Sequence, residues 1–148
     1  MIFLGADHRG YDLKERLKRT LVDEGYQVVD LGNDHWDPQD DYVDFAHKVA
    51  EATVGDPQNK GIILCGSGAG VDMVANKIAG IRSALVFDVP RAIQARKHEN
   101  ANVLSLPSDT LDEESAYNIV KAFLLTQFNG ELRHIRRLRK LKKVEEEH

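Results

Sequence analysis

The residues Gly61-Ile62-Ile63-Leu64-Cys65-Gly66-Ser67-Gly68-Ala69-Gly70 are the most informative part of the chain, because an apolar run passes there directly into a glycine-rich turn. The run 62–64 shows no polar alternation, which indicates a strand that is buried on both faces of a parallel sheet. Residues 71–78 then have the pattern of a helix. We therefore expect Cys65, the only cysteine of the chain, at the carboxyl end of a strand and facing a helix N-terminus.

That position favours a reactive or ligand-binding role for the cysteine. Ligands bind at the carboxyl edge of open α/β sheets, and the amides and dipole of a helix N-terminus there favour an anion or a thiolate. Gly66, Gly68 and Gly70 allow the backbone to approach a ligand closely. No Lys-Ser/Thr pair follows them, so the turn is not a nucleotide-binding P-loop. A reactive thiol beside an anion site is one hypothesis, and a cysteine that merely fills the core is the other.

Short apolar runs alternate with longer amphipathic segments along the rest of the chain. The expected strands are 2–4, 27–31, 62–64, 82–87 and 102–106, and the expected helices are 11–24, 42–54, 71–78, 90–98 and 112–128. On the first helix we expect Lys14 to lie on the charged, solvent-facing side. This alternation predicts an α/β fold with one doubly wound five-stranded parallel sheet, a Rossmann-like three-layer sandwich. The length suits a single domain over residues 1–148.

The last segment carries seven Lys and Arg residues between 132 and 144. Its apolar residues are three apart: Leu132, Ile135, Leu138 and Leu141. This spacing predicts an extra C-terminal helix with an apolar stripe and a basic exterior. We expect the helix, within residues 130–146, to pack on a partner subunit.

Composition and charge exclude several classes of protein. With 42% hydrophobic and 30% charged residues, the chain resembles an ordinary soluble globular protein. Its net charge of -4 argues against nucleic acid as a partner. A lone cysteine forms no internal disulfide, and no leader or membrane-length apolar run is seen. We therefore expect a cytoplasmic protein that does not associate with membranes.

Other candidate residues stand at the ends of predicted elements. Asp7 and His8 follow the first strand, and they share a rim with Cys65 if the two strands are neighbours. Histidine suits acid–base work or a phosphate contact, whereas the alternative is a capping Asp followed by a surface His. His98 closes the fourth helix, where a cation is favourable with or without a function.

Arg133 and Arg137 are four residues apart and project from one face of the last helix. Two guanidiniums on one face suit a phosphate, although most of the basic residues there must simply be solvated. Asp41, Asp44 and Asp72 are possible carboxylate bases or exposed helix residues. The six histidines show no metal-ligand spacing. The sequence implies no metal and no cofactor.

Several separate motifs, in the same order, resemble the ribose-5-phosphate isomerase B family, which shares its fold with galactose-6-phosphate isomerase subunits. The resemblance covers residues 1 to about 141. The matching segments are Gly5-Ala6-Asp7-His8-Arg9-Gly10, Asp41-Tyr42, residues 63–70, Ala75-Asn76-Lys77 with Gly80-Ile81-Arg82, His98 with residues 100–104, and Arg133-His134 with Arg137.

The resemblance implies reversible isomerisation of ribose 5-phosphate to ribulose 5-phosphate, a step of the pentose phosphate pathway, without metal or cofactor. Cys65 is then the base that moves a proton between C2 and C1, and Ser67 and His98 assist ring opening. The implied substrate-binding residues are Asp7, His8, Tyr42, Gly66, Gly68, Ala69, Gly70, Glu99, Arg133 and Arg137. Among them, His8 and the two arginines would bind the phosphate. The resemblance also implies a homodimer, or a tetramer of paired dimers, with the active site between subunits.

The chain departs from the family pattern in its contact loops. Glu99 stands where an asparagine is usual, and Pro107-Ser108-Asp109 replaces a Gly-x-Arg, so one phosphate-binding arginine is missing. Arg9 or Arg136 is a candidate to replace it. Two further departures are Val43 and Glu131-Leu132. A six-carbon substrate such as allose or galactose 6-phosphate therefore stays open, as does a catalytically silent sugar-phosphate-binding protein.

Overall fold

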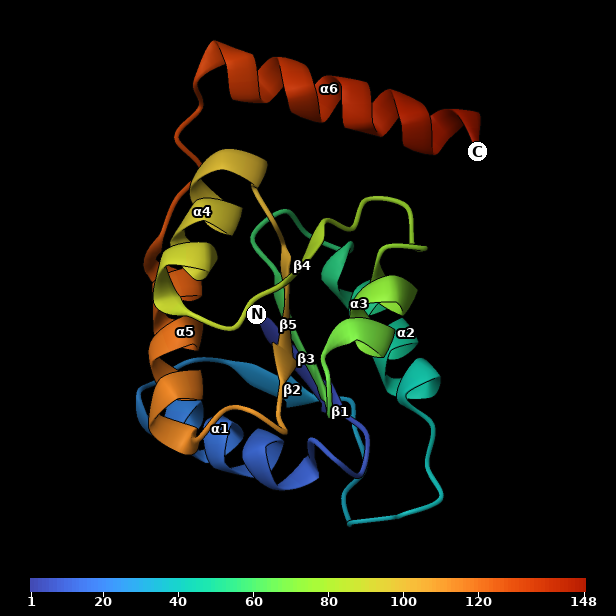
Figure 1. Cartoon of the computed structure of the whole chain (residues 1–148), viewed down its shortest axis with the longest axis vertical. Helices are drawn as coiled ribbons and strands as arrows, with labels where there is room; N and C mark the ends of the chain where they lie inside the picture. The colour runs from blue at the N-terminus through green and yellow to red at the C-terminus, as the bar shows by residue number, and fades with distance from the viewer.

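The apolar run 62–64 forms the middle of β3 (Lys60–Cys65), the central strand of a five-stranded sheet. The computed structural model describes residues 1–148. The strands are all parallel and stand in the order β2-β1-β3-β5-β4. The other four are β1 (Ile2–Ala6), β2 (Val28–Asp30), β4 (Ser83–Leu85) and β5 (Val103–Pro107). The predicted doubly wound α/β fold is confirmed (Figure 1).

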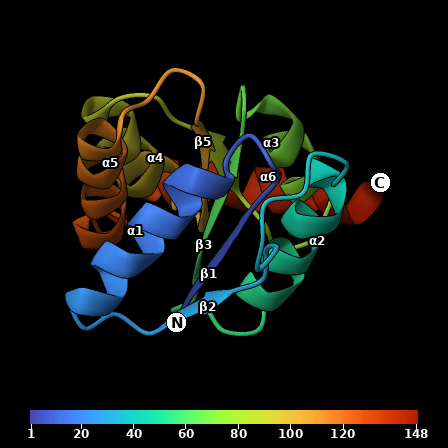
Figure 2. The ribbon, with the colours of Figure 1, turned by 90° about the horizontal axis from the view of Figure 1, so that it is seen from below.

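Helices cover both faces of the sheet, as Figure 2 shows in a view along the strands. They are α1 (Tyr11–Asp23), α2 (Tyr42–Thr53), α3 (Ala69–Ala75), α4 (Val89–Glu99), α5 (Glu113–Leu125) and α6 (Leu132–Glu147). On one face lie α1, α4 and α5, and on the other lie α2 and α3. None of the six helices has both the length and the apolar character of a membrane span.

The lack of polar alternation in β3 reflects burial on both of its faces. Ile62 and Leu64 belong to the larger apolar cluster, under α1, α4 and α5. Ile63 and Cys65 belong to the smaller cluster, under α2 and α3. Burying each such aliphatic side chain contributes about 1.5–3 kcal/mol, so β3 anchors both layers. The strand thereby fixes the position of Cys65, its last residue, at the carboxyl edge of the sheet.

Three helices differ from their predicted bounds by two residues or more. The helix expected over 71–78 begins at Ala69, because Gly68 caps it in a left-handed conformation with φ +74°, and it ends at Ala75. The helix expected over 112–128 ends at Leu125, because Thr126 adopts an extended conformation. The C-terminal helix continues past 144 to Glu147.

Lys14 is a further correction, because its side chain is fully buried instead of lying on the charged face of α1. Its ammonium group lies 2.9 Å from the Asp30 carboxylate at the end of β2. A buried charge needs such a partner. The carboxylate, brought from a neighbouring strand, explains why the lysine turns inward.

The helix α6 crosses the amino ends of the strands (Figure 1). Near its end, the Gly80 amide donates a hydrogen bond to Glu145 at 3.0 Å. Its apolar stripe is not fully covered by its own chain, since Leu132 is 84% and Leu141 53% exposed. Packing of this helix on a partner subunit stays a prediction.

Candidate active site

The thiol of Cys65 lies at the carboxyl end of β3, under the glycine-rich turn. The Gly68 amide donates a hydrogen bond to its Sγ at 3.2 Å. The next amide, of Ala69, donates to Ser67 Oγ at 3.2 Å. Cys65 therefore lies at the carboxyl end of a strand and faces the start of α3, as the sequence predicted.

Neighbouring side chains leave no room for a Cβ atom at Gly68 or Gly70 of the turn. A Cβ on Gly68 would lie 2.6 Å from Leu85 Cδ1, and its φ of +74° disfavours other residues as well. A Cβ on Gly70 would lie 2.7 Å from the Tyr42 ring. The predicted substrate-binding Tyr42 is thus packed against the start of α3, beside the cysteine turn.

Ser105, a residue of β5, fixes the position of the glycine turn. Its fully buried hydroxyl donates to the carbonyl oxygen of Gly68. The sequence analysis missed this residue, whose one available signal is a hydroxyl side chain within the apolar strand β5.

Asp7 reaches the same edge because β1 pairs with β3, with Ala6 opposite Leu64. The predicted common rim is therefore confirmed. The Asp7 carboxylate is buried, and its Oδ1 accepts hydrogen bonds from the amides of Arg9 at 3.0 Å and Gly10 at 3.2 Å. These bonds shape the turn that presents the next side chains to the site.

His8 is fixed by Asp40, a residue that the sequence analysis did not select. Asp40 Oδ1 lies 2.9 Å from both the backbone nitrogen and the ring Nδ1 of His8. The hydrogen bond that the ring donates to Asp40, with a smaller contribution from the charge of Asp7, raises the pKa of His8 above its ordinary value. The ring is thereby favoured as a cation, the form that suits a phosphate.

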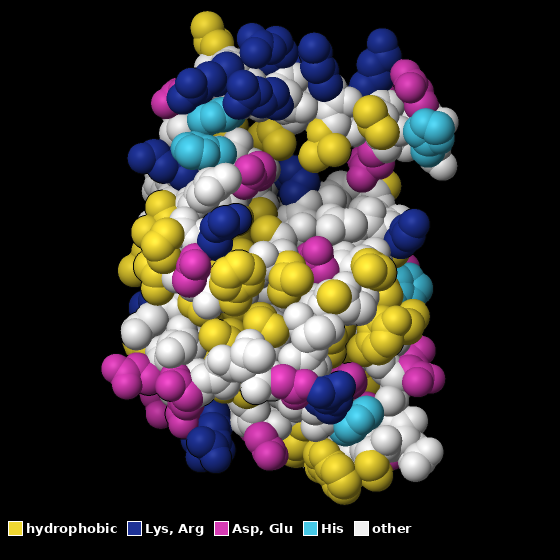
Figure 3. Space-filling model, in the orientation of Figure 1, with side chains coloured by type: hydrophobic (Ala, Val, Ile, Leu, Met, Phe, Trp, Pro, Cys, Tyr) yellow, Lys and Arg dark blue, Asp and Glu magenta, His cyan; other side chains and the backbone are white.

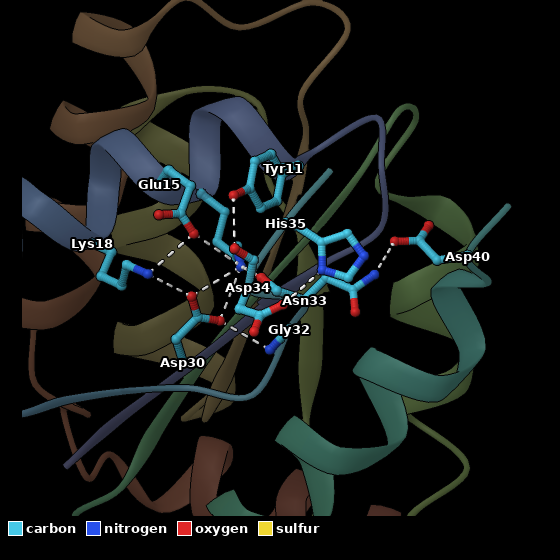
Figure 4. Close-up of polar contacts among 10 residues, drawn as sticks. Tyr11, Glu15, Lys18, Asp30, Gly32, Asn33, Asp34, His35 and Asp40 are labelled. Atoms are coloured by element: carbon cyan, nitrogen blue, oxygen red, sulfur yellow. Dashed lines mark hydrogen bonds and ion pairs between the residues drawn. The ribbon is translucent and has the colours of Figure 1, made fainter. Parts of the chain in front are cut away.

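Asp40 is in turn held by a polar network that reaches the core (Figure 4). Asn33 Nδ2 donates to Asp40 Oδ2 at 2.8 Å, and the Asn33 carbonyl accepts from Lys14 Nζ at 2.8 Å. Lys14 also pairs with Asp30. The loop between β2 and α2 is therefore connected, through its own polar groups, to a buried ion pair.

The remaining predicted residues lie at the opposite edge of the sheet. Because α4 runs back from the carboxyl edge, His98 and Glu99 stand at the amino ends of the strands, where α6 begins. The His98 ring stacks on that of His134, with centroids 4.5 Å apart. Burial, and then the charge of His98, lower the pKa of His134.

Arg133 and Arg137 are both exposed on α6, and Arg133 pairs with Glu131 at 2.9 Å. Figure 3 shows Lys and Arg side chains gathered along this helix, at one end of the molecule. A single chain therefore brings Cys65, Ser67, Asp7, His8, Tyr42 and the glycines together. It does not bring His98, Glu99, Arg133 or Arg137 to them.

Known proteins resemble this chain over almost its whole length. A crystal structure of ribose-5-phosphate isomerase B from Mycoplasma genitalium with bound ribulose-5-phosphate is 41% identical, with a TM-score of 0.95, and the match covers 99% of this chain and 97% of that one. The probable ribose-5-phosphate isomerase B of Mycoplasma pneumoniae is 42% identical over 146 residues, which is 99% of this chain and 95% of the relative.

Ribose-5-phosphate isomerase B of Mycobacterium tuberculosis is 40% identical, across 99% of this chain and 91% of the relative. The family model described as Ribose/Galactose Isomerase matches residues 2–141. The chain therefore belongs to the ribose/galactose isomerase family.

Proposed function

We propose that this protein interconverts ribose 5-phosphate and ribulose 5-phosphate, an aldose–ketose isomerisation. The observation that carries the proposal is the Cys65 thiol, which accepts a hydrogen bond from the Gly68 amide of the glycine turn. The Mycoplasma genitalium relative with the same fold holds ribulose-5-phosphate. A cytoplasmic location is in keeping with a sugar-phosphate substrate and a single unpaired cysteine.

Cys65, as thiolate, would take the proton from C2 of the open-chain aldehyde. The C2 electron pair then forms the C1–C2 double bond, and the carbonyl electrons move to O1 to give an enediolate. Returning the proton to C1 while O2 becomes the carbonyl, with one proton passing from O2 to O1, yields the ketose. Abstraction of this kind needs a base and a stabilised oxyanion, and amides of the turn at Gly66, Gly68, Ala69 and Gly70 would supply the second.

Sugar hydroxyls would contact Asp7 and Tyr42, and the phosphate would contact His8. His98, which with Ser67 would assist ring opening, would come from a second copy of the chain, as would Glu99, Arg133 and Arg137. Phosphate binding far from the reacting carbons holds the sugar in the reactive geometry.

An exposed apolar surface beside the turn supports the homodimer. Leu85 is 38%, Phe87 56% and Ile93 38% exposed, and Leu85 touches the turn at Gly68. Burying such side chains against a second copy is favourable. In a symmetric dimer, the residues at the amino ends of one chain's strands would then lie over the Cys65 edge of the other chain's sheet.

The direct test is turnover of ribose 5-phosphate, with chelator present, together with the molar mass in solution. The proposal expects ribulose 5-phosphate as product and a mass of two or four chains. A six-carbon substrate is the second candidate, because the family description includes galactose isomerases. Turnover of allose or galactose 6-phosphate in preference to the pentose would select it.

A further inference from the structure

Arg9, which the sequence offered as a replacement for the missing phosphate-binding arginine, lies at the Cys65 edge of the sheet. A Cβ placed on Gly66 would lie 2.5 Å from Arg9 Cζ and Nε, and 2.8 Å from Asp109 Oδ2. Gly66 directly follows Cys65 in the chain. The Arg9 guanidinium therefore covers the first residue of the glycine turn.

The loop after β5 holds Arg9 in that place. Ser108 Oγ lies 3.0 Å from the Arg9 carbonyl oxygen and 2.8 Å from that of Cys65. The Asp109 amide donates to the Gly66 carbonyl at 3.0 Å. The Asp109 carboxylate pairs with the Arg9 guanidinium. Both the backbone and the side chain of Arg9 are thus tied to the Cys65–Gly66 segment.

This ion pair leaves the guanidinium available to a ligand. The side chains of Arg9 and Asp109 are 57% and 41% exposed, and an ion pair so exposed adds little to stability. A guanidinium carries five N–H donors, and the Asp109 contact is made by one terminal nitrogen, Nη2. The remaining donors form a planar, oriented group that matches a phosphate.

We propose that Arg9, positioned by Asp109, binds the phosphate of the substrate beside His8. The inference rests on the proposed function, because it names a further residue of that site. Arg133 and Arg137 lie at the opposite edge of the same chain, whereas His8 and Arg9 are consecutive and share the Cys65 edge. The phosphate would therefore be held by cations from both subunits.

The test is steady-state kinetics of Arg9→Ala with ribose 5-phosphate. A lost charge-assisted hydrogen bond costs about 1.5–3 kcal/mol, so KM rises about tenfold or more. The kcat stays within about threefold, because the phosphate does not take part in the proton transfer. Arg9→Lys, which keeps the charge but loses the planar donors, gives an intermediate KM. A lowered kcat with unchanged KM would place Arg9 at the enediolate and overturn the inference.

Arg16 provides a matched control, because it pairs with Glu113 at 3.2 Å and its side chain is also 57% exposed. Arg16→Ala should leave KM unchanged. Asp109→Ala should raise KM in the wild-type background but not in the Arg9→Ala background, since its effect passes through Arg9. Equal effects of Asp109→Ala in both backgrounds would contradict the positioning role.

Calorimetric titration with inorganic phosphate separates this inference from the proposed function. The dissociation constant should rise about tenfold or more in Arg9→Ala, whether or not the wild-type protein turns over a pentose phosphate. Loss of phosphate binding in Arg9→Ala together with no wild-type turnover would sustain the inference and reject the function. Equal phosphate binding by wild type and Arg9→Ala, or none by either, would overturn the inference.

Discussion

One carboxylate oxygen of Asp40 accepts two hydrogen bonds from His8, from its backbone amide and from ring Nδ1, both at 2.9 Å. The pair fixes the ring orientation and favours a proton on Nδ1. The ring Nε2 is then the nitrogen left for a ligand. A residue 32 positions away in the chain thus sets the charge and direction of the imidazole.

The pH dependence of substrate binding should show the effect of Asp40 on the pKa of His8. Asp40 raises the pKa of His8, and the protonated ring binds phosphate, so KM is low below that pKa and rises as the pH passes it. Asp40→Asn removes the main cause of the raised pKa and should move the rise in KM to lower pH. Asp34→Asn is the control, because Asp34 contacts the exposed His35 ring at 2.7 Å in the same way. Identical KM profiles for wild type and Asp40→Asn would contradict the assignment.

Lys14 should be essential to stability. Lys14→Met leaves the Asp30 carboxylate without its fully buried partner, which should lower the free energy of unfolding by about 3–5 kcal/mol. Lys18 contacts the same carboxylate at 2.8 Å but is 32% exposed, so Lys18→Met should cost no more than about 1 kcal/mol. Urea unfolding measures both, and equal losses would show that burial of Lys14 is not what matters.

The glycine turn should tolerate no side chain at Gly68. Gly68→Ala meets both a positive φ and the Leu85 side chain, so it should lower stability by more than about 1 kcal/mol and lower kcat as well. Gly25 also has a positive φ but no atom within 4 Å of a Cβ. Gly25→Ala should therefore lower stability alone. Thermal unfolding and turnover assays compare the two variants. An unchanged kcat in Gly68→Ala would show that the turn is not part of the active site.

Mixing inactive variants tests whether the active site is shared between subunits. Cys65→Ala and His98→Gln should each be inactive, yet a dimer containing one of each has one site with both native residues. After unfolding and refolding together, the mixture should recover about a quarter of wild-type activity, since about half of the dimers are mixed and have one of two sites intact. No recovery, with mixed dimers verified by mass, would mean that each site is built from one chain.

The sequence predicted the parts of the fold that local pattern controls. The unbroken apolar run 62–64 identified a buried strand. The sequence put Asp7 and His8 on the rim of Cys65 on the condition that their strands are neighbours, because the carboxyl ends of parallel strands meet at one edge. The start of α3 was missed by two residues, because the left-handed Gly68 begins the helix sooner than its apolar pattern does.

The residues that the sequence analysis missed depend on contacts between distant segments. Lys14 looks like a surface lysine until Asp30 is brought beside it, and Asp40 looks like one of several loop acids until it meets His8. Ser105 gains its role only when β5 is placed next to β3. Arg9 was named from the sequence as one of two candidate cations, but its tie to Cys65 appears only when the loop after β5 is in place. No periodicity within a single segment carries this information.

Turnover of ribose 5-phosphate by wild type, Cys65→Ala and Cys65→Ser, with chelator present, tests directly whether Cys65 is the base. Loss of a general base costs about 10²–10⁴-fold, so kcat should fall by that factor in both variants while phosphate binding persists. Asp72, whose carboxylate accepts a hydrogen bond from Ser83 at 2.6 Å, is the other candidate base. A Cys65→Ala variant that keeps most of the wild-type kcat would show that Cys65 is not the base and would make Asp72 the candidate.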